Sequence, residues 1–68
     1  MGRNNFMVTL TDADSGEMTA HFFRDVRDAE EFYDCKVNQY SAAPLFKRVV
    51  EFWERVDYPA SWKQIKFF

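Results

Sequence analysis

A chain of 68 residues is long enough for one small domain, and its 47% hydrophobic and 29% charged residues exclude a disordered chain. The formal net charge of −2 and the pI of 5.2 do not favour a nucleic-acid-binding protein. Neither a signal-peptide pattern nor an apolar run long enough to cross a membrane is seen, so we predict a cytoplasmic protein without a membrane partner.

The first predicted element is an antiparallel hairpin. Residues 6–11 alternate between apolar and more polar side chains, which predicts a half-buried strand. A polar turn follows over residues 12–17, in which Gly16 offers a position for positive φ. Residues 18–23 alternate as well and complete the hairpin.

Two helices are predicted after the hairpin. Residues 26–37 have apolar side chains at spacings of three and four, and Asp25 precedes them as an N-cap. A connector follows, and Ser41 then caps a second helix over residues 42–57. The apolar stripe of this second helix is wide, and the pair Tyr58–Pro59 ends it.

The last segment, residues 61–68, is predicted as a third strand that joins the hairpin. Its alternation places one set of side chains on the same face: Trp62, Gln64, Lys66 and Phe68. The expected fold class is therefore α+β, a single domain over residues 1–68 in the order β-β-α-α-β. It has a three-stranded antiparallel sheet with both helices on one face.

Catalytic, cofactor and metal sites are not expected. The turn that begins at Asp12 resembles the start of a calcium loop, but Gly16 is its fifth rather than its sixth residue. Phe23 stands where that loop needs a glutamate. Cys35 and His21 are the single residues of their kinds, and two glycines do not make a phosphate-binding loop. We predict no enzyme, no cofactor and no metal.

Charge and aromatic content are the unusual features of the composition. Residues 1–34 carry eight acids and three bases, a charge of −5, whereas residues 35–68 carry three acids and six bases, a charge of +3. Phe, Tyr and Trp make up 19% of the chain, more aromatic surface than one small core encloses. Some rings should therefore be exposed, and exposed aromatic patches mark interfaces.

These features predict a small non-catalytic domain that binds a larger protein and inhibits or modulates it by occluding its surface. Acidic side chains that imitate phosphates would suit a partner that processes nucleic acid, as a DNA mimic does. The size and composition, though no motif, are similar in general style to phage-encoded inhibitors of host enzymes. The predicted contacts are acids of the turn and the first helix, with two exposed rings: Asp12, Asp14, Glu17, Phe23, Asp28, Glu31, Tyr33 and Asp34.

Two alternatives stay open. Surplus aromatic side chains can close on each other in a homodimeric structural or subunit-type protein. Basic and aromatic residues interleave in the C-terminal half, which is typical of a module that binds single-stranded nucleic acid. Glu51 and Glu54 interrupt these bases and count against such a partner. The basic and aromatic set is Lys47, Arg48, Trp53, Arg55, Tyr58, Trp62, Lys63 and Lys66.

Overall fold

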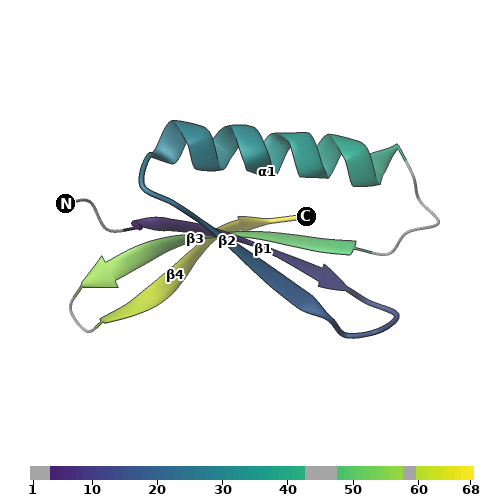
Figure 1. Ribbon diagram of the computed structural model, residues 1–68, viewed down its shortest axis with the longest axis horizontal. Helices are drawn as coiled ribbons and strands as arrows, with labels where there is room; N and C mark the ends of the chain where they lie inside the picture. Colours follow the sequence, from purple (N-terminus) through teal and green to yellow (C-terminus); the bar gives the residue numbers. More distant parts are fainter. Residues whose placement is uncertain (1–3, 43–47, 58–59) are drawn as a thin grey trace.

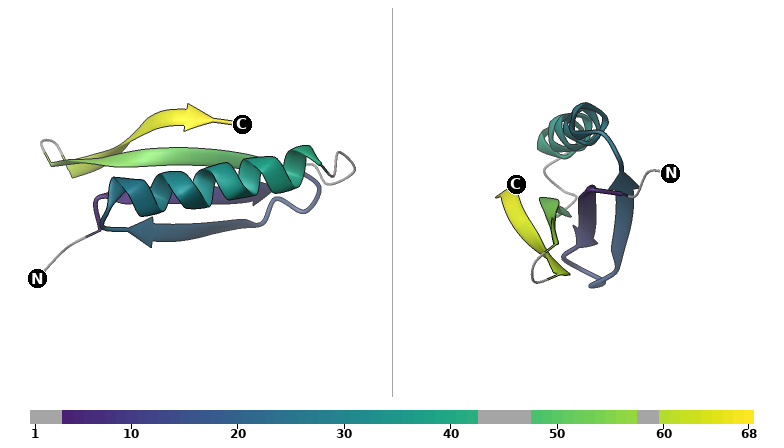
Figure 2. Two further views of the ribbon diagram at one scale, coloured as in Figure 1. Left: turned by 90° about the horizontal axis from the view of Figure 1, so that it is seen from above. Right: turned by 90° about the vertical axis from the view of Figure 1, so that its left-hand side faces the viewer.

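The computed structural model describes residues 4–42, 48–57 and 60–68, which form one helix and four strands (Figure 1). In chain order they are β1 (Phe6–Asp12), β2 (Met18–Phe23), α1 (Val26–Ser41), β3 (Arg48–Asp57) and β4 (Ala60–Phe67). The strands form one antiparallel sheet in the order β2-β1-β3-β4, with β2 and β4 at its edges. Helix α1 lies along one face of the sheet (Figure 2). The protein is an α+β domain, as predicted, with a different count of elements.

The first hairpin confirms the prediction. Strands β1 and β2 pair along their length, and the turn between them contains Gly16 at a φ of 79°. The Gly16 N–H donates to the Asp12 carbonyl at 2.7 Å, and the Asp12 N–H donates to the Glu17 carbonyl at 2.8 Å. Gly16 and Glu17 thus both bond to Asp12, which is a β-bulge. Its first residue has a positive φ, which glycine adopts without strain.

Helix α1 begins where predicted and ends later. Asp25 is its N-cap, and the Asp25 carboxylate accepts a hydrogen bond from the Arg27 N–H at 3.0 Å. The helix continues through Ser41, because residues 38–41 contain neither proline nor glycine to stop it. The expected role of Ser41 as the cap of another helix is therefore wrong. Among the described residues, no helix is both long and apolar enough to cross a membrane.

The predicted second helix over residues 42–57 is also wrong, because strand β3 occupies most of that range. In β3, Val50 and Phe52 point toward α1 and are buried. The residues that alternate with them, such as Glu51 and Trp53, lie on the other face. Valine and aromatic residues favour strands, and an apolar stripe too wide for one side of a helix fits a strand with two apolar faces. The sheet therefore has four strands instead of three. The remainder of the predicted helix, residues 43–47, lies outside the described residues.

The C-terminal segment is a strand, as predicted, but it pairs with β3 and does not join the first hairpin, and its alternation breaks. Phe52 pairs with Lys66, whereas the next residue of β3, Trp53, pairs with Gln64, so Ile65 is an extra residue in β4. This bulge puts Lys66 and Gln64 on opposite faces of the sheet. The four residues that the sequence placed on one face are therefore divided between the two.

The core lies between α1 and the sheet face that it covers. Its buried apolar residues come from three elements: Val8, Leu10, Ala29, Tyr33, Val50 and Phe52. The Phe52 ring lies edge-on to Phe6, with the ring centres 6.1 Å apart, and 5.7 Å from the Tyr33 ring. Phe52 therefore joins β1, β3 and α1 through aromatic contacts.

We expect Phe52→Ala to lower the free energy of unfolding by about 3–5 kcal/mol, because the substitution removes a buried ring and leaves a cavity. Urea denaturation followed by tryptophan fluorescence measures the change. Phe67→Ala is the matched control, since the Phe67 ring is 72% exposed. Its free energy of unfolding should change by no more than about 0.5 kcal/mol. Equal losses in the two variants would contradict this description of the core.

Candidate protein-binding surface

The predicted acidic contacts lie in two separate places. The β1–β2 turn holds one group and the exposed surface of α1 the other: Asp12, Asp14 and Glu17 in the turn, and Asp28, Glu31 and Asp34 in α1. Strand β2 runs from the turn to the start of α1, and its six residues span roughly 20 Å. The turn and the start of α1 thus lie at opposite ends of the sheet (Figure 1). Asp28, in the first turn of α1, is therefore far from the acids of the β1–β2 turn, whereas Glu31 and Asp34 lie further along α1, which runs back over the sheet toward that turn.

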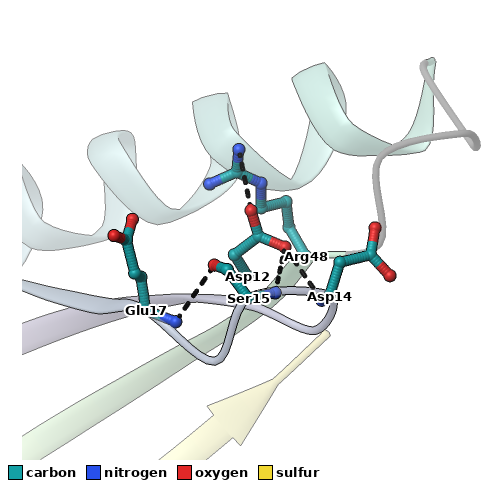
Figure 3. A network of polar contacts seen from close by, with 5 residues as sticks. All are labelled: Asp12, Asp14, Ser15, Glu17 and Arg48. Atoms are coloured by element: carbon teal, nitrogen blue, oxygen red, sulfur yellow. Dashed lines mark hydrogen bonds and ion pairs between the residues drawn. The ribbon is translucent and has the colours of Figure 1, made fainter.

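The Asp12 carboxylate is held within the turn (Figure 3). Its Oδ1 accepts from the Asp14 N–H at 2.9 Å and the Ser15 N–H at 3.5 Å, and its Oδ2 lies 3.6 Å from Arg48 Nη2. The Asp14 N–H is the main reason that the pKa of Asp12 lies below its usual value of 3.8, against a smaller opposing effect of burial. The Ser15 N–H and Arg48 also lower this pKa. Asp12 therefore stabilises the turn and is less available to a partner.

The two rings predicted as exposed anchors pack against the core. Tyr33 is only 6% exposed and contacts Phe52. Burial raises the pKa of the Tyr33 hydroxyl above 10.0, and the Asp34 carboxylate acts in the same direction. Phe23 is half-buried, with its ring centre 5.3 Å from that of Phe32 in α1. The expectation that these two rings are exposed is wrong.

The basic and aromatic residues of the C-terminal half do not gather on one face. Lys66 Nζ lies 4.8 Å from the centre of the Tyr33 ring, on the side of α1. The Arg55 guanidinium lies 5.2 Å from the centre of a Trp62 ring, on the opposite face. By register, Arg48, Lys63 and Lys66 lie on the side of α1. Both tryptophans lie on the opposite face, so the described bases and tryptophans do not combine in the one basic, aromatic groove that binds single-stranded nucleic acid. Two members of the set lie outside the described residues: Lys47 and Tyr58.

The sheet face opposite α1, named the open face below, carries four large apolar side chains that are exposed. Strand alternation and register define its members: Met7, Thr9, Thr11, Met18, Ala20, Phe22, Val49, Glu51, Trp53, Arg55, Asp57, Ala60, Trp62, Gln64 and Phe67. Of these, Met18 is 63%, Phe22 51%, Val49 37% and Phe67 72% exposed. Large apolar side chains exposed on one face of a small domain mark an interaction site.

The charged side chains at the centre of the open face already have partners. Glu51 Oε2 accepts a hydrogen bond from Gln64 Nε2 at 3.0 Å. Arg55 Nε donates to the Asn4 carbonyl at 2.9 Å while its guanidinium stacks on Trp62. Covering a charge that keeps its hydrogen bond costs less free energy than covering an unpaired one, so this face is suited to burial.

Aromatic rings shape the open face. Trp53 Nε1 donates to Thr9 Oγ1 at 3.0 Å, and Thr9 is only 3% exposed. The Phe22 ring on β2 lies 6.0 Å from the Trp62 ring on β4, although three strand spacings, roughly 14 Å, separate these edge strands. Rings at the two edges approach this closely because a twisted sheet curls. The open face is therefore curved and aromatic at this end.

The chain offers little for metal or covalent chemistry within its described residues. Those residues contain no group of three or more His, Cys, Asp or Glu side chains that could hold a metal ion. The His21 ring packs on Phe32 with the ring centres 4.7 Å apart, and Cys35 is exposed on α1. No protein-family model matches the chain, and comparisons with curated proteins and with solved structures found no match. Function must therefore be argued from this geometry.

The sequence does contain a signal for the open face, which the helical interpretation of residues 42–57 concealed. When the segment is read as a strand, Val49 and Trp53 fall opposite Val50 and Phe52. A strand that is apolar on both sides either has both sides covered or leaves an apolar surface to solvent. Only the register of β3 against β1 shows which side α1 covers.

The Asp12 contacts predict a pH dependence of stability. Because the pKa of Asp12 is lower in the folded state than the usual 3.8, the ionised carboxylate stabilises the fold above that pH. Its contribution is lost as the pH falls through the lower, folded value. The difference in thermal stability between the wild type and Asp12→Asn should therefore shrink below pH 3.8.

Thermal unfolding monitored by circular dichroism at a series of pH values measures this difference. Glu31→Gln controls for the loss of one negative charge, because Glu31 is exposed on α1, away from the turn. A difference between wild type and Asp12→Asn that is constant with pH would contradict the lowered pKa.

Proposed function

We propose that the protein is a non-catalytic protein-binding domain that occludes the surface of a larger protein with its open face. One observation carries the proposal, the exposure of four apolar side chains on a single face: Met18, Phe22, Val49 and Phe67. Apolar surface of this kind on a soluble domain is typical of a protein interface.

The centre of the open face has the composition of an interface hot spot. Tryptophan and arginine are enriched among the residues that dominate binding free energy, and Trp53, Trp62 and Arg55 lie together there. Trp53 is fixed by its hydrogen bond to Thr9, and Arg55 by its bond to the Asn4 carbonyl. Side chains that are already held in place lose less conformational entropy on binding, which strengthens the interaction.

Inhibition or modulation of the partner follows from the same mode of binding. A domain seated on a functional surface excludes the other ligands of that surface, and no reaction at the interface is required. The acids of the turn and α1 would then act at a distance, by accelerating the encounter with a basic partner. Phosphate mimicry receives less support, because Asp28 is in the first turn of α1, at the opposite end of the sheet from the β1–β2 turn, and the Asp12 carboxylate is already held by the turn and by Arg48.

Two double variants distinguish the open face from the acids. Val49→Asp with Phe67→Asp places two charges on the open face, and Asp28→Lys with Glu31→Lys reverses two charges of α1. Each variant is immobilised beside the wild type, nuclease-treated lysate of the source organism is passed over all three, and retained proteins are identified by mass spectrometry. The affinity of any specifically retained protein is then measured for each variant after circular dichroism has shown that it is folded.

We expect the open-face variant to bind the retained protein at least about tenfold more weakly, because buried apolar contacts are replaced by charges. The charge-reversed variant should change mainly the association rate and its salt dependence. Unchanged affinity of the open-face variant together with loss of binding by the charge-reversed variant would overturn the proposal.

A further inference from the structure

The two edges of the sheet differ in how they are protected. Strand β4 carries Lys63 and Lys66 and a bulge at Ile65, which are features that discourage pairing with another strand. Strand β2 contains no Asp, Glu, Lys, Arg or Pro, and its register against β1 has no shift. Helix α1 lies over the face of the sheet and not beside the edge of β2 (Figure 2). An edge strand without charged residues, proline or a bulge presents unpaired backbone N–H and carbonyl groups, with which another strand can pair.

The hydrogen-bond alternation identifies which backbone groups β2 offers at its edge. The Asp12 N–H donates to the Glu17 carbonyl, and the Asn5 N–H donates to the Phe23 carbonyl. Glu17 and Phe23 therefore both bond toward the segment that contains β1, and bonded residues alternate along an antiparallel ladder. In β2, the residues bonded to β1 are the odd-numbered ones. The other three direct their N–H and carbonyl groups away from β1: Met18, Ala20 and Phe22.

We propose that two copies of the chain pair antiparallel along β2, around a two-fold axis at Ala20, to form one continuous sheet with four strands from each copy. In this register Ala20 faces Ala20 of the second copy, and Met18 faces Phe22 of the second copy. All three outward-directed residues of each β2 then bond across the axis. Methionine and aromatic side chains make favourable contacts, so the exposed Met18 and Phe22 gain a partner.

Symmetry and charge both favour a second copy in the antiparallel direction, because Met18 and Phe22 lie at equal distances from Ala20. Glu17 precedes β2 and Arg24 follows it, so the two ends of the strand carry opposite charges. In this antiparallel register Glu17 faces Phe23 of the second copy, so like charges are kept apart at both ends of the joint. Parallel pairing would instead align like charges, which destabilises a strand pair. A six-residue edge makes a small interface, so dissociation in the micromolar range is expected.

The pairing does not depend on the partner proposed above, because it rests on the edge of β2. It would nevertheless enlarge the open face, since Met18 and Phe22 belong to both surfaces. The two open faces of a dimer would join across the axis into one apolar surface.

A pair of variants at the axis tests this register. Ala20→Lys and Ala20→Glu each place two like charges against each other and should raise the dissociation constant of the homodimer by roughly tenfold or more. An equimolar mixture of the two should form a heterodimer with an affinity near that of the wild type. Sedimentation over the micromolar range measures the dissociation constants, and native mass spectrometry separates heterodimer from homodimer by mass.

Ile65→Lys adds the same charge to the β4 edge, where Ile65 is 47% exposed, and should dimerise like the wild type. The variant with Val49→Asp and Phe67→Asp should also dimerise, so failure of partner binding and failure of dimerisation are separate results. Ala20→Cys in a Cys35→Ser chain needs no buried charge, and it should give a disulfide-linked dimer on mild oxidation. The Cα atoms of facing bonded residues lie about 5.5 Å apart, within reach of a disulfide.

A wild-type chain that stays monomeric throughout the micromolar range would overturn the proposal. So would a mixture of folded Ala20→Lys and Ala20→Glu chains that gives no heterodimer. Equal weakening by Ile65→Lys would place the interface on β4 instead of β2, and absence of the Ala20→Cys crosslink would exclude the two-fold axis at that residue.

Discussion

The packing of α1 on one face of the sheet is the contact on which the rest of the structure depends. Ala29 and Tyr33 from the helix meet Val8, Val50 and Phe52 from the two central strands, and these residues form the dry core. A domain of this length buries only roughly 60% of the surface of its unfolded chain. One 16-residue helix covers one face of four strands, and the other face is left to solvent or to another molecule. The exposed rings and the free sheet edge follow from that shortage of covering elements.

Aromatic residues pack on both faces of the sheet. Phe52 and Phe6 have no polar atom to satisfy and meet on the covered side of the sheet. The indole of Trp53 needs a hydrogen-bond acceptor when it is partly buried, and it finds the hydroxyl of Thr9 on the open face. Trp53 thereby shields the face of β1 that the helix does not cover. The high aromatic content is thus explained by two faces that need large side chains instead of one.

The elements that could be predicted from the sequence are those with local causes. The hairpin follows from alternation and the glycine turn, and the start of α1 follows from the Asp25 cap. Strand β3 could not be separated from a helix, because its apolar residues satisfy both periods and only pairing with β1 decides between them. Burial of Tyr33 could have been predicted, since it lies on the same helical stripe as Ala29. The placement of the β1–β2 turn and the start of α1 at opposite ends of the sheet depends on the path of β2 through the fold and has no local signal.

The central pairing of β1 with β3 joins segments that lie far apart in the chain. Asp12 faces Arg48 in this β1–β3 pairing, called the central seam, and β2 and the whole of α1 lie between the two residues in sequence. Hairpins such as β1–β2 and β3–β4 form within about 1–10 μs, whereas a seam of this kind must first close a long loop. The seam therefore governs the folding rate more than the local elements do, because rates fall as contacts become more distant in sequence. Until it closes, the chain consists of two hairpins and a helix without a common core, and cooperativity arises only when β1 and β3 meet.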